Sequence, residues 1–312
     1  MGRRNKKGDK VDGWVNLDKP LGMTSTQAVG KIRRIMNGQK VGHAGTLDPL
    51  ASGVLPIALG EATKTIPYMQ DAFKTYEYTV TWGEQRSTDD AEGEVMASSD
   101  VRPARDQIEA TLPVFMGQIV QTPPKFSAIK IDGQRAYDLA RKGEAVTVQP
   151  RDVYVESLEL LSCDENTATF LMTCGKGTYV RSIARDMALQ MGTYGYVSAL
   201  RRMAVGCFDA QDTISLEMLE ELEHIPARDA ALLPVQVVLD DIPALEVKQA
   251  EVTALRNGRA LSLISRSDFQ RIEDLHLDGE APYEALAIHQ GTAIAIVDID
   301  GPQVKPVRVF NI

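Results

Sequence analysis

Strand-like segments that follow one another directly are the feature that most constrains the fold of this chain. KTYEYTVTW, which begins at Lys74, alternates aromatic or β-branched residues with polar ones. Further strands are expected in GEVMAS, near 152–161, near 166–174 and in VSALRRMAVGCF, and helices in STQAVGKIRRIM, PARDQIEATLPVFMG and about 179–191. Because most of these strands have no helix between them, the sequence predicts an α+β fold, with a mixed, largely antiparallel central sheet and flanking helices.

The length of the chain predicts two domains. At 312 residues it exceeds the size at which a single core usually stops growing. An acidic helical stretch leads into a proline-marked connection, so we place the boundary near residue 240. The larger domain would span 1–240, with a basic arm at 1–12. The short apolar segments LSLIS, ALAIHQ, TAIAIVDIDG and PVRVFNI predict a small β-barrel at 241–312.

Composition and charge distribution limit the location and partners of the protein. No apolar run approaches the roughly 20 residues that cross a bilayer, and the three cysteines are far apart, so we expect a cytoplasmic protein without a membrane association. The net charge of −9 argues against a polyanionic partner, yet residues 1–40 carry ten Lys and Arg against three Asp. Such a basic arm can steer RNA to one face, or it can be a disordered, solvated tail. A monomer is the default expectation.

The segment VGHAGTLDPLASGVLPIALG contains the first candidate for chemistry, Asp48. Its small residues, prolines and glycines predict a buried loop from Gly42 to Gly60 whose backbone passes close to a neighbouring group. A carboxylate among Leu47, Pro49 and Leu50 would be poorly solvated, which disfavours its charged form unless a cation lies beside it. The alternative is an Asp that caps a glycine-rich turn.

Other candidates lie in KGTYVRSIARDMA and KTYEYTV. Arg181 stays protonated even when buried, so it could keep Asp48 ionised; alternatively it is a surface residue paired with Asp186. Tyr76 and Tyr179 offer faces on which an unstacked base can rest, although a tyrosine in a strand is commonly a core residue. His43 has no second His or Cys nearby, so we expect no metal site.

Taken together, these segments resemble the TruB family of tRNA pseudouridine synthases over nearly the whole chain. The resemblance is carried by GWVNLDKPLGMTS, GHAGTLDPLASGVLPIALGEATK, QTPPKFSAIKIDGQRAYDLAR, GKGTYVRSIARD and VSALRRMAVG. The tail, with LRNGRALSL and PVRVFNI, is similar to the PUA-type RNA-binding domain of bacterial members. The resemblance implies the pseudouridine synthase catalytic fold and isomerisation of a T-loop uridine, position 55 in tRNA numbering, by base flipping without metal or cofactor. It implies tRNA as the partner, through the T-arm stem-loop, and no obligate protein partner.

The family's site residues carry over position by position. Asp48 matches the nucleophilic aspartate, Tyr76 the active-site tyrosine and Arg181 the arginine that pairs with the aspartate. His43, Tyr76, Tyr179 and Leu200 match positions that line the target-nucleotide pocket. The chain departs from the family's Thr-Asp-Thr stretch at Arg86-Ser87-Thr88, whereas Asp90 still matches the aspartate that follows. We expect this departure to alter RNA contacts.

Other functions fit the sequence less well. A hydrolytic glycosidase needs a second, protonated carboxyl, which the motif does not offer. An aspartyl-phosphate enzyme places its nucleophile before the Gly-Thr pair, the reverse of the order here, and needs Mg²⁺ with further carboxylates. A tRNA-binding or folding module that acts independently of catalysis remains the alternative function, and both functions can coexist in one protein.

Overall fold

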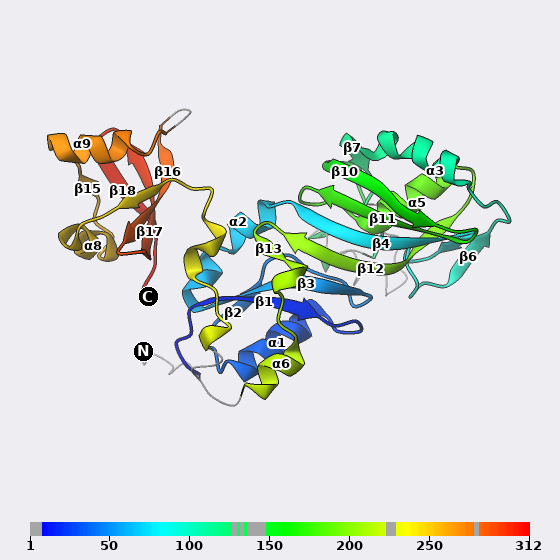
Figure 1. Ribbon diagram of the computed structural model, residues 1–312, viewed down its shortest axis with the longest axis horizontal. Helices are drawn as coiled ribbons and strands as arrows, with labels where there is room; N and C mark the ends of the chain where they lie inside the picture. The colour runs from blue at the N-terminus through cyan, green and yellow to red at the C-terminus, as the bar shows by residue number, and fades with distance from the viewer. Residues whose placement is uncertain (1–7, 127–129, 132–133, 136–147, 223–228, 278–280) are drawn as a thin grey trace.

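Two β-sheets organise the chain. The computed structural model describes residues 8–126, 130–131, 134–135, 148–222, 229–277 and 281–312. Within these residues, a nine-stranded sheet is built from residues 13–209 and a five-stranded sheet from residues 244–309 (Figure 1). The smaller sheet curls into a half-barrel beside the larger one.

The large sheet has the predicted mixed, largely antiparallel character. Its main path runs β1-β3-β12-β4-β11-β10-β7, with β2 and β13 pairing β3 and β12 at the side. Among these pairs β3 and β12 run parallel, and the rest are antiparallel. Its strands are β1 (Gly13–Lys19), β2 (Val41–His43), β3 (Ala51–Leu59), β4 (Lys74–Trp82), β7 (Gly117–Gln121), β10 (Arg151–Cys163), β11 (Thr167–Cys174), β12 (Gly195–Val205) and β13 (Phe208–Asp209). The predicted α+β fold class is confirmed.

The remaining elements flank this sheet or form the second one. Two short antiparallel pairs form separate two-stranded sheets: β5 (Glu84–Arg86) with β6 (Val95–Ser98), and β8 (Lys130–Ile131) with β9 (Gln134–Arg135). The small sheet holds β14 (Ala244–Glu246), β15 (Leu261–Ser262), β16 (Tyr283–His289), β17 (Thr292–Asp300) and β18 (Gln303–Val309). The helices are α1 (Ser25–Ile35), α2 (Ile66–Asp71), α3 (Arg105–Thr111), α5 (Val180–Gln190), α6 (Leu216–Glu221), α8 (Gln249–Arg256) and α9 (Arg266–Glu273), with 3-10 turns η1 (Gly60–Lys64), η2 (Leu112–Phe115), η3 (Ala210–Asp212) and η4 (Val235–Val238).

The alternation in β4 sets the core of the large sheet. Tyr78, Val80 and Trp82 are buried on one face, where the Tyr78 ring stacks on Phe170 of β11 with centroids 5.3 Å apart. Helix α5 covers this face with an apolar side that includes Met187. Because the apolar side of α5 packs against this face of the sheet, the N-terminal end of α5 is held at a fixed place over the strands.

The predicted buried loop from Gly42 to Gly60 is wrong over most of its length. Residues 41–43 form β2 and residues 51–59 form β3, a buried strand of the large sheet, and only the stretch between them is a loop. Pro56 misled the prediction, because proline rarely occurs in a central strand. It lies between the residues of β3 that pair with β12 and those that pair with β2. Gly53, with φ +100°, passes so close to Arg202 that a Cβ would lie 2.2 Å from its carbonyl oxygen.

The two sheets share a hydrophobic cluster. It joins Trp14, Val54 and Phe208 of the large sheet to Ile296 and Phe310 of the C-terminal part. Hydrogen bonds accompany it: Lys64 Nζ donates to the Val309 carbonyl and Arg308 Nη1 to the Lys64 carbonyl, at 2.6 and 2.9 Å. The boundary expected near residue 240 falls between β13 and β14.

The N-terminal arm is described only from residue 8, so most of its basic residues lie outside the described part. Asp9 donates its backbone N–H to the Asn37 carbonyl at 2.6 Å, and the Asp12 carboxylate accepts from the Glu61 amide at 2.7 Å. This end of the arm therefore packs on the turn after α1 and on η1. None of the described helices is long and apolar enough to cross a membrane.

Candidate active site

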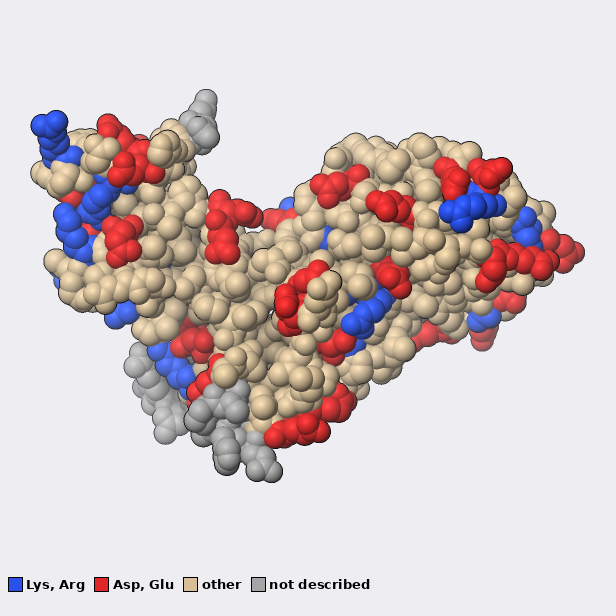
Figure 2. All heavy atoms as spheres, in the orientation of Figure 1, with Lys and Arg blue, Asp and Glu red and all other residues tan. Residues whose placement is uncertain are grey.

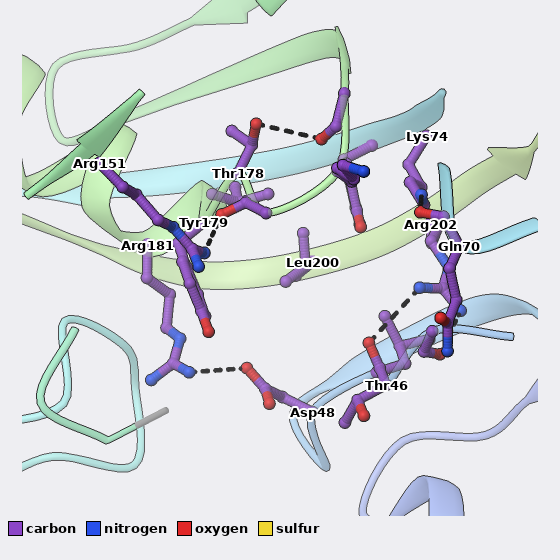
Figure 3. A pocket seen from close by; sticks show the side chains of 17 residues that line it. Thr46, Asp48, Gln70, Lys74, Arg151, Thr178, Tyr179, Arg181, Leu200 and Arg202 are labelled. Carbon is purple, nitrogen blue, oxygen red and sulfur yellow. Dashed lines mark hydrogen bonds and ion pairs between the residues drawn. The ribbon is translucent and has the colours of Figure 1, made fainter. Parts of the chain in front are cut away.

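A pocket of about 290 Å³ opens where the β2–β3 loop, β4, β12 and the start of α5 meet (Figure 3). Of the residues predicted for the site, Asp48, Tyr76, Tyr179, Arg181 and Leu200 all line it. They come from separate segments, and the first and last of them, Asp48 and Leu200, are more than 150 positions apart in the chain. The fold thus gathers five of the six predicted site residues around one cavity.

The charged centre of the pocket is a chain of two carboxylates joined by one guanidinium. Arg181 Nη2 donates to Asp48 Oδ2 at 2.8 Å, and Arg181 Nη1 donates to Asp90 Oδ2 at 3.0 Å. The same two nitrogens also donate to the carbonyls of Phe126 and Thr88, each at 3.0 Å. Four hydrogen bonds therefore fix the plane of the guanidinium beside Asp48.

Burial differs across this chain of charges. The side chains of Arg181 and Asp90 are 7% and 3% exposed, whereas that of Asp48 is 38% exposed. Asp48 is thus more accessible than its aliphatic neighbours suggested, because Leu47 turns into the core instead of covering it. The buried Asp90 carboxylate anchors the Arg181 guanidinium, and the accessible Asp48 carboxylate faces the pocket.

The surface alternative for Arg181 is wrong. Asp186 pairs with Arg185, one helical turn later, at 2.8 Å. Arg185 also binds Asp89 at 3.0 Å, so Arg181 and Arg185, one turn apart on α5, bind the adjacent residues Asp90 and Asp89. The turn-capping alternative for Asp48 is not what the side chain does, since its Oδ2 accepts from Arg181.

The loop that carries Asp48 is held from both sides. The Ser25 hydroxyl, 3% exposed at the start of α1, exchanges two hydrogen bonds with the backbone of Leu47, at 2.9 and 2.8 Å. On the other side, Arg202 donates through Nη2 and Nη1 to the carbonyls of Gly45 and Thr46, at 3.3 and 3.5 Å, and through Nε to Val54 at 2.7 Å. The N-terminal motif and β12 therefore position the candidate nucleophile together.

Two tyrosines and a leucine form walls of the pocket. The hydroxyl of Tyr76 has a raised pKa because of burial, which the positive charge of Arg202 partly opposes. The Tyr179 ring lies under the guanidinium of Arg151, whose carbon is 5.0 Å from the ring centroid, and Arg151 also donates to the Gly177 carbonyl. Arg151 thereby fixes the Tyr179 ring against the pocket (Figure 3).

His43 does not line the pocket. It ends β2, two residues before Gly45, and its ring Nδ1 is buried without a hydrogen-bond partner among the described residues. Burial lowers the pKa of His43, and the positive charge of Arg202 lowers it further, so the ring is neutral near pH 7. Its contact with a target nucleotide stays a prediction.

Basic residues outnumber acidic ones in the lining of the pocket, in a protein of net charge −9. Lys74, Arg151, Lys176, Arg181 and Arg202 line it, with Asp48 as the acidic lining residue. Lys74 is 7% exposed and donates to the carbonyls of Gln70 and Ala72, at 2.6 and 2.5 Å. Burial, with some repulsion from Arg202, lowers its pKa to about 8. The lining favours an anionic ligand.

Several other basic residues are engaged by contacts inside the protein. Lys19 is fully buried and donates to the carbonyls of Pro20 and Met23, and Arg202 is 1% exposed. Arg201 pairs with Asp18 at 2.9 Å, and Lys64 with Glu61 at 2.6 Å. Local sequence does not reveal whether a cation is buried, which is why these roles were missed.

Figure 2 shows how charge is distributed on one face of the molecule. Acidic side chains cover the region of α6 and the tip beyond β6, while basic and acidic side chains lie together over the C-terminal sheet and its helices. Within the described ranges, no group of three or more His, Cys, Asp or Glu is placed to hold a metal ion.

Comparisons with known proteins agree on one family. The model of the TruB family pseudouridylate synthase N-terminal domain matches residues 33–180, and that of the tRNA pseudouridylate synthase B C-terminal domain matches residues 181–242. Relatives named tRNA pseudouridine synthase B include one from Caulobacter vibrioides, 48% identical over 99% of both chains. Another, from Bradyrhizobium diazoefficiens, is 50% identical over 97% of this chain and 86% of the relative.

Solved structures show the same fold at lower identity. A Cbf5-Nop10-Gar1 complex contains a chain that matches with a TM-score of 0.69 and 24% identity, covering 95% of this chain and 84% of that one. An H/ACA RNP bound to a substrate RNA containing 2′-deoxyuridine gives a TM-score of 0.71 at 21% identity, covering 99% and 91%. With relatives about half identical along its whole length, this chain belongs to the TruB family of pseudouridylate synthases.

Proposed function

We propose that this protein isomerises a uridine of tRNA to pseudouridine, with Asp48 as the nucleophile and the T-loop uridine at position 55 as the target. The observation that carries the proposal is the accessible Asp48 carboxylate held 2.8 Å from a buried guanidinium inside a tyrosine-walled pocket. The relatives' name, tRNA pseudouridine synthase B, supplies the class of RNA.

The residues suit a reaction that conserves every atom of the substrate. An oxygen of Asp48 attacks C1′, and the C1′–N1 bond breaks with its electron pair passing to uracil. After the base turns, C5 attacks C1′ and releases the carboxylate; the proton on C5 is then lost and N1 gains one. Because substrate and product are isomers, no redox cofactor or second substrate is consumed. Arg181 supports this role, since its Nη2 donates to Asp48 Oδ2 at 2.8 Å and so orients the carboxylate in the pocket.

The tyrosines suit the handling of the freed base. Base and sugar must be lifted from the RNA stack, and aromatic faces hold an unstacked base. We assign the ring of Tyr76 as the platform on which uracil turns, with Tyr179 and Leu200 as further walls. The raised pKa keeps the Tyr76 hydroxyl protonated near neutral pH, so it acts as a hydrogen-bond donor. His43, neutral beside Gly45, would contact the nucleotide from the loop side.

The regions outside the pocket are proposed to bind the rest of the RNA. Residues 241–312 would act as a PUA-like RNA-binding domain, an assignment that rests on the resemblance of LRNGRALSL and PVRVFNI to that domain. The basic arm, 1–12, would add attraction for phosphate. Arg86 of the departing Arg86-Ser87-Thr88 stretch is engaged with Glu84 at 2.8 Å and lies over the Tyr196 ring.

A direct assay tests the proposal. The purified protein is incubated with an unmodified T-arm stem-loop, and the RNA is digested and analysed for pseudouridine at each uridine. We expect modification at the T-loop uridine corresponding to position 55. If RNA is bound but no pseudouridine forms, the alternative of a binding or folding module replaces the proposal. Modification at a different uridine would overturn the T-loop assignment alone.

A further inference from the structure

Two buried cations lie at one side of the Asp48 pocket. Lys74 is 7% exposed and Arg202 is 1% exposed, and both line the cavity. Arg202 pairs with Tyr76 across β12 and β4, and Lys74 lies two residues before Tyr76 on β4. Directly paired residues, and residues two apart on a strand, point to the same face of a sheet. Lys74 and Arg202 therefore lie beside Tyr76 on the pocket face, across the cavity from Arg181 (Figure 3).

Neither cation forms an ion pair with the residues that the structure describes. Lys74 is held by two carbonyls at the end of α2, and Arg202 by three carbonyls of β3 and of the loop that carries Asp48. The charge of Asp71 reaches Lys74, but Asp71 pairs with Lys176 at 2.7 Å. Burial and the positive charge of Arg202 lower the pKa of Lys74, so the two cations repel each other. The fold thus keeps two like charges together in a buried place.

Holding backbone carbonyls does not require these charges. An uncharged N–H group also donates to a carbonyl, whereas a buried cation without an opposite charge is costly to the fold. An arginine, moreover, does not lose its proton to avoid this cost. An anion in the pocket would offset it. This side of the cavity therefore suits a ligand that carries or develops a negative charge beside Tyr76.

The proposed reaction produces such a charge on the base. Asp48 begins as an anion, and its attack on C1′ forms a neutral ester while the electron pair of the C1′–N1 bond passes to uracil. The negative charge has then moved from the carboxylate to the base, where it spreads over N1, O2 and O4. It returns to the carboxylate when C5 attacks C1′. A group that stabilises the detached base therefore lowers the barrier to breaking the glycosidic bond.

We propose that Lys74 and Arg202 form an anion site that stabilises the negative charge of the detached uracil. The inference rests on the proposed function, because it takes the target nucleotide to occupy the Asp48 pocket. Cations fixed in advance act strongly where charge develops in a site with little water. Both cations lie beside Tyr76, the platform assigned to the turning base, while Arg181 binds the carboxylate on the other side. Each end of the charge movement then has its own cation.

The test compares two leaving groups in the same RNA. A T-arm stem-loop carries either uridine or 5-fluorouridine at the target position. Fluorine withdraws electrons, so the fluorinated base stabilises its own negative charge and depends less on the protein. Lys74→Met removes the cation and keeps a side chain of similar length. In single-turnover reactions at pH 7, consumption of the target nucleoside should slow about 100-fold for uridine and only about tenfold for 5-fluorouridine, with Kd for the RNA within about threefold of the wild type.

Two further variants complete the comparison. Arg202→Gln keeps N–H donors for the loop carbonyls without the charge, so it should show the same gap between the two substrates. Lys64→Met is the matched control, because Lys64 also donates to a carbonyl, that of Val309, but does not line the pocket. It should change the rates of the two substrates by the same factor.

The outcomes separate an anion site from a structural role. Equal slowing of both substrates in Lys74→Met and in Arg202→Gln would overturn the proposal, because structural damage does not distinguish between leaving groups. A raised Kd with unchanged rates would also overturn it and would indicate a contact with phosphate. A wild type that binds the stem-loop and consumes neither nucleoside would refute the proposed function itself, whereas an active wild type with equally slowed variants would refute the anion site alone.

Discussion

Replacing Arg181 by lysine probes the ion pair while preserving its charge. The guanidinium makes four hydrogen bonds through two nitrogens that point at different partners: Asp48 and Phe126 from one, Asp90 and Thr88 from the other. An ammonium offers three donors from a single point, so it cannot span both carboxylates. The Arg181→Lys variant should lose at least two of the four hydrogen bonds.

The size of the effect follows from which bonds are lost. A hydrogen bond to a charged partner contributes about 2 kcal/mol and one to a carbonyl about 1 kcal/mol. If this loss of about 3 kcal/mol is felt in the transition state, kcat falls by about 100-fold. The assay is release of tritium from C5 of uridine in a T-arm substrate, measured under single-turnover conditions with enzyme in excess.

Arg185→Lys is the matched control. Arg185 lies one turn further along α5, binds Asp89 and Asp186, and does not line the Asp48 pocket. Its replacement should lower the unfolding temperature while kcat stays within about threefold of the wild type. The reasoning is refuted if Arg181→Lys keeps kcat within threefold, or if both variants lose activity equally.

Three further predictions concern the support of the site. Gly53→Ala should destabilise the fold by about 3 kcal/mol in urea unfolding, because φ is +100° and the added Cβ would meet the Arg202 carbonyl; Gly22→Ala, with φ +75° and open space, should cost clearly less. Ser25→Ala removes both hydrogen bonds to Leu47, so we expect a loss of about 2 kcal/mol in stability together with a lower kcat, and an unchanged kcat would show that the loop is held by other contacts. Lys74 has a folded-state pKa of about 8, below its ordinary value of 10.5, so between pH 8 and pH 10.5 the unfolded state binds more protons than the folded state. The contribution of Lys74 to the free energy of unfolding therefore rises with pH across that window and is lost toward pH 8. The stability advantage of the wild type over Lys74→Met should therefore grow from pH 8 to 9.5, and a constant difference between the two would contradict the lowered pKa.

The sequence predicted the fold class because its strand periodicity is local. Alternation in KTYEYTVTW directly reports which residues of β4 face the core, and the absence of helices between strands limits the sheet to mixed, largely antiparallel arrangements. The strand at 51–59 was missed because a fully buried apolar run has no alternation, and its glycines and Pro56 resemble loop residues.

Sequence motifs identified the residues of the candidate site, but they did not identify the residues that hold the site in place. Nothing near Ser25 indicates that its hydroxyl binds Leu47, 22 positions away, and nothing in the Arg201-Arg202 pair shows that one side chain is buried and the other paired with Asp18. These roles arise from tertiary contacts between distant segments. Local patterns describe single elements, so such contacts become visible only in the folded chain.

The central claim is that the charge of Asp48 opens the glycosidic bond. Asp48→Asn keeps the size of the side chain and an oxygen that can accept from Arg181 Nη2, but it removes the anion. Single-turnover reaction of this variant with the T-arm stem-loop should yield no pseudouridine, while its Kd for the same RNA stays within about threefold of the wild type. Pseudouridine formed by Asp48→Asn at the wild-type rate would contradict the claim.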